Sequence, residues 1–213
     1  GKEVKKELIA LSPNDTLRIT FKNNDFYDKE IDNRVDFRLT QDETNREIIY
    51  SNNVSIKILP TKDTVPYLQI EKIALGKSME EARKRAEKIK YGYKIIGNQL
   101  VLDNYLITEL KDQYRDQKVE IKLYLPKGTL FKVNSSAKNY DYSDNSFFNL
   151  HTSSEEYIYN VKDSQVKCLN CPDEENEFDD IENDRTDRME TTTVSVKVGG
   201  KEVIETVTKK PIN

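Results

Sequence analysis

The sequence predicts a mainly β fold with one short helix around residues 78–90. Apolar and polar residues alternate in several short runs, which is the pattern of strands that are buried on one face. Eighteen asparagines separate these runs, many of them paired or beside aspartate as in Asn23-Asn24-Asp25, and asparagine tolerates the backbone of tight turns. Helical spacing occurs in a single stretch. Short strands with many turns are typical of a sandwich or a solenoid, and the pattern leaves both open.

The composition indicates a thin core and a large surface. The chain has 213 residues, of which 36% are hydrophobic and 34% are charged. A chain of this length can bury one core, with room for one appendage. We therefore expect a flat, elongated β architecture.

Three candidate strands lie in the N-terminal part of the chain. Residues 16–22 alternate strictly, with an apolar side chain at every second position. The same alternation recurs over residues 35–39 and over residues 54–58, before Pro60. Each run is predicted to form a strand with one buried face.

The predicted helix begins at Ser78. Ser78 and Glu81 form a capping box, in which a hydroxyl and a carboxylate accept hydrogen bonds from backbone N–H groups at the helix start. Four apolar residues then recur at helical spacing and predict a narrow buried stripe. The stripe consists of Met79, Ala82, Ala86 and Ile89.

The C-terminal half supplies the remaining candidate strands. Residues 119–125 alternate most clearly and are followed by the turn signal Pro126-Lys127-Gly128. Residues 193–198 and 203–208 flank Gly199-Gly200, which predicts a two-residue hairpin turn. The other candidates are residues 91–96, 99–102, 129–133, 147–150, 157–161 and 165–169.

The charge is unevenly distributed and divides the chain into three parts. Residues 172–190 hold ten acidic residues and two arginines, a local charge of −8, whereas the whole chain carries −4. Such a segment buries too little apolar surface to order itself, so we interpret it as an acidic linker. We predict a β domain over residues 1–171, the linker over 172–190, and a β-hairpin appendage over 191–213.

The charge pattern argues against a nucleic-acid partner, and the hydropathy pattern argues against a membrane span or a signal peptide. The remaining charge of about +4 is not clustered, so we expect no nucleic-acid partner. No run approaches the roughly 18–20 apolar residues of a membrane span, and no signal peptide follows the first residues. Because the chain begins with Gly1 rather than Met, we interpret it as a soluble domain excised from a longer protein.

Several blocks of sequence together resemble one protein family. They occur in the order Gly76-Lys77-Ser78, Glu81-Ala82, Ala86, Ile89, Tyr91, Leu100-Val101-Leu102-Asp103-Asn104-Tyr105 and Val119-Glu120-Ile121-Lys122-Leu123-Tyr124-Leu125-Pro126-Lys127-Gly128-Thr129. In this order they resemble the C-terminal soluble domain of Bacteroidetes-type PspC-domain (phage-shock-protein C) membrane proteins. The resemblance covers roughly residues 10–171 and places the chain in the toast-rack group, which is similar to adhesin-type β-solenoid domains.

The resemblance implies a fold, a location and a role. The fold would be a single-domain β-solenoid, right-handed and β-helix-like, with its one helix around residues 78–90. The location would be the periplasmic or extracytoplasmic face of the inner membrane, with the domain tethered by upstream transmembrane helices that this sequence lacks. The role would be envelope-stress sensing, adhesion or protein interaction, with protein partners at the envelope and a homo-oligomer among the options. The family supplies no catalytic residues.

Cys168 and Cys171 allow more than one interpretation. A Cys-x-x-Cys pair can be redox-active when a thiolate is stabilised, or can form half of a zinc site. Pro172 and an acidic run follow, which would raise a thiol pKa, and zinc would need further ligands when only His151 remains. The family resemblance places a cysteine pair at the end of such domains. We favour a structural disulfide or two inert thiols over redox chemistry.

The other candidate sites have simpler interpretations. His151 lies near Thr152, Ser153, Ser154 and Glu155, but neighbours in a loop do not by themselves form a catalytic triad. Seven acidic residues could bind Ca²⁺, yet they lack the spacing and glycine of an EF-hand loop. Those seven are Asp141, Asp144, Asp179, Asp180, Glu182, Asp184 and Asp187. Five of the twelve tyrosines fall in candidate strands, where packing explains them. These five are Tyr91, Tyr93, Tyr124, Tyr157 and Tyr159.

The sequence therefore favours a domain that is not an enzyme and that needs no cofactor or metal. We assign no catalytic, cofactor-binding or metal-binding residue, and expect the domain to act through protein contacts. The alternative is an adhesin-like module that binds cell-surface glycan or matrix, which a groove with clustered Tyr and Asn or Asp would favour. A glycan hydrolase is a third candidate and would need two suitably spaced carboxyl groups in a cleft.

Overall fold

A computed structural model describes residues 1–24, 37–172, 191–198 and 201–208. The chain divides into two compact units, Gly1–Cys171 and Pro172–Asn213, and each is described by itself. Among the described residues, the first unit contains three sheets and one α-helix, and the second contains one strand pair.

The first sheet of the larger unit has four strands in the order β1-β6-β10-β5. β6 lies antiparallel to β1 and β10, and β5 lies parallel to β10. β5 is the last strand of this sheet, so Pro60, which lacks an N–H, interrupts no ladder, and the strand runs past the predicted end at residue 58. The strands are β1 (Lys2–Leu8), β5 (Val54–Thr61), β6 (Tyr67–Ile73) and β10 (Lys118–Pro126).

The second sheet has six strands in the order β13-β12-β11-β2-β8-β7. β2 lies near its centre and pairs in parallel with both β8 and β11, although these strands are far apart in the sequence. Antiparallel strands complete both sides of this parallel centre. The strands are β2 (Thr16–Lys22), β7 (Tyr93–Ile96), β8 (Gln99–Asp103), β11 (Leu130–Val133), β12 (Tyr159–Val161) and β13 (Val166–Cys168).

The inner faces of these two sheets share one hydrophobic core. Every second residue of the central strands enters it, as Leu17, Ile19 and Phe21 do from β2 and as four residues do from β10. Phe131, Phe148 and Tyr159 pack together in the core, with ring centroids 5.1–5.4 Å apart. The strict alternation in the sequence therefore predicted the core side of these strands correctly.

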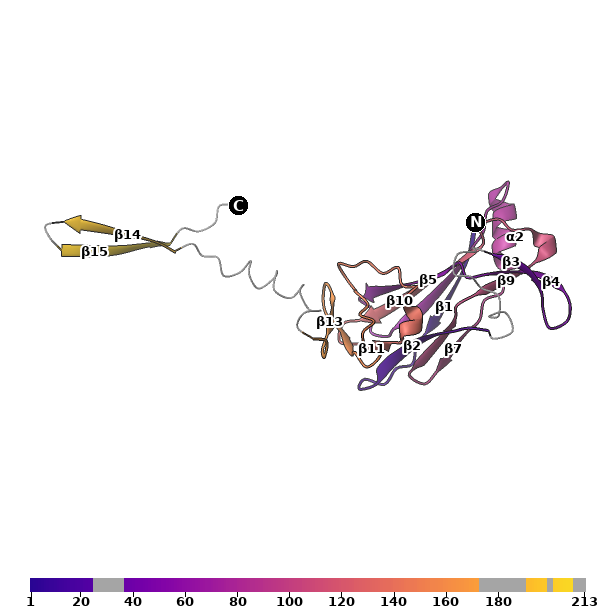
Figure 1. The fold of residues 1–213 in the computed structure, drawn as a ribbon, viewed down its shortest axis with the longest axis horizontal. Helices are drawn as coiled ribbons and strands as arrows, with labels where there is room; N and C mark the ends of the chain where they lie inside the picture. The colour runs from indigo at the N-terminus through magenta and orange to yellow at the C-terminus, as the bar shows by residue number, and fades with distance from the viewer. Residues whose placement is uncertain (25–36, 173–190, 199–200, 209–213) are drawn as a thin grey trace. The chain divides into compact units, whose positions relative to one another are not determined.

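The helix and a three-stranded sheet lie together at one end of the larger unit, and β13 lies at the other end (Figure 1). α2 (Met79–Glu87) has Ser78 as its N-cap, and the Ser78 hydroxyl accepts from the Glu81 N–H at 3.1 Å. Ala82, Ala86 and Ile89 are buried as predicted, whereas Met79 is 79% exposed and does not belong to the buried stripe. The small sheet consists of β3 (Arg38–Gln41), β4 (Glu47–Ser51) and β9 (Leu106–Glu109).

The structure confirms a mainly β fold and corrects several boundaries. Residues 147–150 are not a strand, because Phe147 and Phe148 enter the core from a turn. The sequence reasoning missed β1, β4, β6 and β9, and residues 35 and 36 of one predicted strand lie outside the described residues. The helix is also shorter than residues 78–90. The solenoid geometry stays a prediction.

The smaller unit contains two antiparallel strands. β14 (Thr191–Val198) pairs with β15 (Lys201–Thr208) in a register that sets Val198 opposite Lys201. The predicted turn at Gly199-Gly200 lies outside the described residues, and so does the predicted acidic linker from residue 173 to residue 190.

Candidate functional site

Two adjoining hollows on the larger unit form the candidate site. Their volumes are about 700 Å³ and about 530 Å³, and Gly92, Asp103 and Tyr105 line both of them. The first extends toward the end of α2 and toward β9. The second extends toward Lys22, the last residue of β2, and toward Asn23 and Asn24, which follow it. We call the two together the Asp103 groove.

Backbone pairing brings the residues of the Asp103 groove together. Asp103 is the last residue of β8, and its N–H donates to the Gly92 carbonyl at 3.1 Å. Lys90 and Ile107 exchange both backbone hydrogen bonds, at 2.8 and 3.0 Å, and so join the segment before β7 to β9. A Cβ at position 92 would clash with Asp103 Oδ2, so a larger residue there would have to displace the Asp103 carboxylate.

Asp103 lies at the centre of a short hydrogen-bond chain. Asn24 Nδ2 donates to the Tyr105 hydroxyl at 3.2 Å, and Tyr105 in turn interacts with the Asp103 carboxylate. Burial raises the pKa of Asp103, although hydrogen bonding to Tyr105 and the nearby charges of Lys22 and Lys94 oppose that rise. The Tyr105 ring stacks on Tyr50 with centroids 5.3 Å apart, which fixes its orientation.

Tyr91 contributes a buried hydroxyl to the same groove. Burial, together with the charge of Asp103, raises the pKa of Tyr91 well above its usual range. Among the described residues the Tyr91 hydroxyl has no hydrogen-bond partner. A buried hydroxyl without a partner costs free energy, and this one is enclosed too tightly for a water molecule to reach it.

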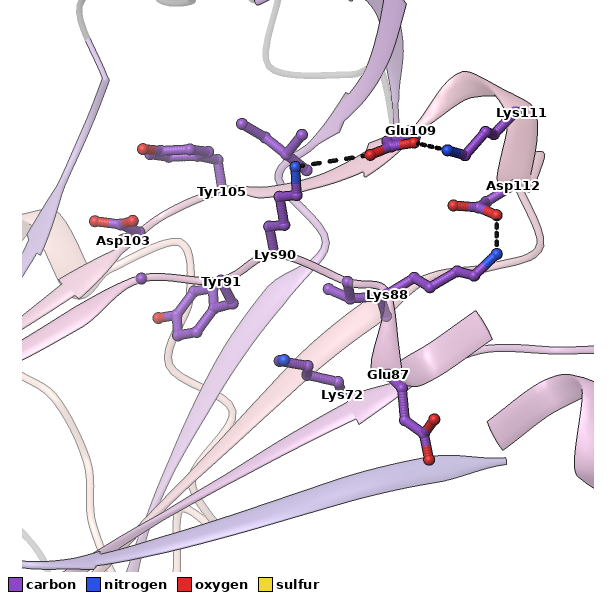
Figure 2. A pocket seen from close by; sticks show the side chains of 13 residues that line it. Lys72, Glu87, Lys88, Lys90, Tyr91, Asp103, Tyr105, Glu109, Lys111 and Asp112 are labelled. Carbon is purple, nitrogen blue, oxygen red and sulfur yellow. Dashed lines mark hydrogen bonds and ion pairs between the residues drawn. The ribbon is translucent and has the colours of Figure 1, made fainter. Parts of the chain in front are cut away.

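Ion pairs fill the other end of the larger hollow. Figure 2 shows Tyr91, Asp103 and Tyr105 on one side and the pairs made by Lys88, Lys111 and their acidic partners on the other. Lys88 pairs with Asp112, and Glu109 pairs with Lys111 at 2.5 Å. Glu87 pairs with Arg83 at 3.1 Å. Of the acidic side chains that line the groove, Asp103 alone makes no ion pair with a described residue.

This arrangement suits binding. One carboxylate, two tyrosine hydroxyls and an asparagine amide offer hydrogen-bond donors and acceptors within one hollow. A hydrolase that uses two carboxyl groups would need a second one free to act beside the first. In the described part of the groove, the other carboxyl groups are engaged with lysine or arginine.

The cysteines that the sequence singled out lie away from the Asp103 groove. Cys168 ends β13 and forms a disulfide with Cys171, with Cα atoms 5.6 Å apart. Neither cysteine lines either hollow. The pair closes the end of the larger unit at the boundary with Pro172.

The other predicted candidates do not come together in one site. The His151 N–H donates to the Tyr159 hydroxyl at 3.1 Å, and its ring lies edge-on to Tyr157. Asp141 and Asp144 accept hydrogen bonds from serines two residues later, as turn residues do. In the part of the chain that the structure describes, no three His, Cys, Asp or Glu side chains could jointly hold a metal ion. The five remaining acidic candidates lie outside the described residues.

The tyrosines pack as the sequence predicted, although their positions differ in detail. Tyr159 belongs to the core, Tyr93 packs against it, and Tyr124 stacks on Tyr67 across neighbouring strands, with centroids 4.5 Å apart. Tyr91 and Tyr157 lie outside the strands. The sequence reasoning missed the groove, although Tyr91, Asp103 and Tyr105 were in the blocks that carried the family resemblance. Their meeting depends on tertiary pairing.

The fold defines a class of protein: a mainly β domain whose two larger sheets share one core, with one α-helix among the described residues. The chain belongs to the toast-rack family found in some PspC proteins, whose family model matches residues 40–174. The match begins within β3, so β1 and β2 lie outside it, in contrast to the resemblance from about residue 10. No curated protein and no solved structure matches the chain. No helix among the described residues is long and apolar enough to cross a membrane.

Proposed function

We propose that this chain is a non-enzymatic interaction domain of a PspC-type membrane protein. The family match over residues 40–174 carries the proposal. The domain stands at the extracytoplasmic face of the inner membrane, tethered by upstream helices, and contributes to sensing of envelope stress through protein contacts. Its parallel strands form the coils of a toast-rack solenoid.

An apolar row on the four-stranded sheet supports a protein partner. Leu8, Tyr67, Tyr124 and Leu59 stand directly opposite one another on β1, β6, β10 and β5. Their neighbours along the strands, such as Leu68 and Leu123, enter the core, so the row lies on the outer face of the sheet. Leu8 is 70% exposed. We call these four residues the tyrosine row.

The composition of the row and of its edge indicates how a partner would bind. Tyrosine is enriched at protein interfaces, because a large rigid ring loses little conformational entropy on binding. β1, which contributes Leu8 to the row, is the edge strand of the sheet and carries Lys2, Lys5 and Lys6. Lysines on an edge strand discourage pairing with strands of other molecules. Recognition through the face of the sheet is therefore favoured over addition of a strand.

In-membrane photo-crosslinking tests the proposal. The full-length protein would carry benzoylphenylalanine in place of Leu8, with Ile96 as the matched position, because Ile96 is 60% exposed on β7 of the other sheet. We expect a discrete crosslinked species from position 8 and none from position 96. Leu59→Lys, within the same row, should abolish the species. Identical products from both positions, or no product from position 8, would contradict the proposal.

An adhesin-like module that binds glycan is the second candidate function. One observation favours it: the Asp103 groove brings Tyr93, Tyr105, Asn23 and Asn24 together with a carboxylate. Side chains of these types supply the stacking surfaces and hydrogen bonds that bind polyhydroxylated ligands.

A further inference from the structure

The Asp103 groove contains charged groups whose bonding capacity is unused within the described structure. The Asp103 carboxylate makes no ion pair there, and its two oxygens can accept more hydrogen bonds than Tyr105 and the Gly92 backbone supply. Lys22 and Lys94 line the same hollow and form no ion pair with a described residue.

The charges around the groove select against a charged ligand. A cation that approached Asp103 would also meet Lys22 and Lys94, and an anion bound by the two lysines would meet Asp103. The charges at the far end already neutralise one another, as Lys88 and Asp112 do. A neutral ligand with alternating donors and acceptors avoids both conflicts.

We propose that the Asp103 groove binds a neutral, polyhydroxylated ligand, an uncharged oligosaccharide. Ligand hydroxyls donate to the Asp103 carboxylate and accept from Lys22 and Lys94. This inference rests on the second candidate function and names its site and ligand class. The tyrosine row shares no residue with the groove. A failure of crosslinking from position 8 would therefore leave this inference unaffected, and a failure to bind sugar would leave the crosslinking result unaffected.

The site is held in place before the ligand arrives. Gly92 lets the Asp103 carboxylate approach the backbone, and Tyr50 supports the Tyr105 ring from one side. Preorganised groups lose less entropy on binding.

The test measures binding of defined tetrasaccharides to the full 213-residue chain by titration calorimetry and saturation-transfer NMR. Chitotetraose and cellotetraose are the neutral probes. Fully deacetylated chitosan tetraose keeps the backbone of chitotetraose but carries amines, and a hyaluronan tetrasaccharide supplies carboxylates. We expect at least one neutral probe to bind about tenfold more tightly than either charged probe, as a conflict of about 1.4 kcal/mol would give.

Two variants assign the binding to the groove. Lys94→Met removes one donor at an exposed position of β7, so we expect an unchanged melting temperature together with about fivefold weaker binding, the value of about one hydrogen bond. Asp103→Asn should weaken binding about tenfold or more, because it replaces a charged acceptor. The matched controls are Lys57→Met and Asp163→Asn, which lie outside both hollows and should bind as the wild type does.

Three outcomes would overturn the inference. The first is that neither neutral probe binds at millimolar concentration. The second is that a charged probe binds more tightly than both neutral ones. The third is that Lys94→Met and Asp103→Asn bind with wild-type affinity, which would place any sugar site elsewhere on the chain.

Discussion

Glu71 on β6 and Lys122 on β10 form an ion pair of 2.7 Å across the two central strands of the four-stranded sheet. The Glu71 side chain is only 3% exposed, although it lies on the outer face of the sheet, as the tyrosine row does. Lys2 and Gln69 also contact its carboxylate, at 3.2 and 2.5 Å. Long side chains from neighbouring strands thus enclose one charge and fix this face of the sheet.

Removing Lys122 should destabilise the domain more than removing Lys2. In Lys122→Met, the enclosed Glu71 carboxylate keeps only Lys2 as a positively charged partner among the described residues. We expect the free energy of unfolding to fall by about 2 kcal/mol, less than the 3–5 kcal/mol for breaking a fully buried pair. The Lys2 side chain is 56% exposed, so Lys2→Met should cost less than about 1 kcal/mol. Urea unfolding of both variants measures the difference. Equal losses would show that the two lysines are interchangeable.

The pH dependence of stability should reflect Glu71. Burial alone would raise its pKa, but hydrogen bonds from Lys122, Lys2 and Gln69 outweigh burial and lower the pKa from the ordinary 4.5. The folded state therefore binds the proton less tightly than the unfolded state does. The stabilisation is present above pH 4.5 and is lost as the pH falls through the lowered pKa.

Glu71→Gln is the variant that checks this dependence. It should lose stability at neutral pH and show a smaller fall on acidification, measured by urea unfolding at a series of pH values. Asp144→Asn serves as the control, because Asp144 also has a lowered pKa but accepts its hydrogen bonds from Ser146 in an exposed turn. If the free energy of unfolding of Glu71→Gln fell as steeply on acidification as that of the wild type, other carboxyl groups would dominate acid unfolding.

The helix cap should matter more than the first helical side chain. Ser78→Ala removes the acceptor for the Glu81 N–H and should cost about 1 kcal/mol. Met79→Ala changes a side chain that is 79% exposed, so we expect a change within about 0.5 kcal/mol. Thermal unfolding of the two neighbouring variants compares them directly. A larger loss from Met79→Ala would mean that this side chain packs on a surface after all.

The disulfide should be dispensable for folding. Cys168 and Cys171 close a very short loop, so its removal should cost less than the roughly 3 kcal/mol of a 15-residue loop. We expect the double variant Cys168→Ser, Cys171→Ser to keep the circular dichroism of the wild type and to unfold cooperatively. Loss of the folded state would instead assign the disulfide a major structural role.

The strands that could be predicted from sequence are those that send regular side chains into the core. β2 and β10 alternate without interruption, because each has one face in the core and one face outside it. β6 escaped prediction because its apolar–polar alternation covers only residues 68–71, whereas Tyr67 and Ile73 place apolar side chains at outer-face positions of the strand. β1 carries mostly charged residues, as an edge strand does.

The Asp103 groove could not be predicted because local patterns do not encode it. Asp103 ends the half-buried strand β8, and Tyr91 lies just before β7, so each has a sufficient local explanation. The pairing of β7 with β8 brings Tyr91 near Asp103, and the exchange of hydrogen bonds between Lys90 and Ile107 adds β9 to the groove. The tyrosine row was equally hidden, since its four members come from four strands and share no sequence pattern.

The most direct test of the interaction function is partner retention by the full-length protein in its own membrane. Leu8→Glu places a charge on the tyrosine row, and Ile96→Glu places the same charge on the other sheet at a similarly exposed apolar position. Both variants should keep the wild-type melting temperature. The account predicts that Leu8→Glu lowers the amount of co-purifying partner about tenfold or more, as loss of an interface hot spot does, while Ile96→Glu retains it. Equal retention by the two variants would contradict the claim that this face of the domain binds a protein.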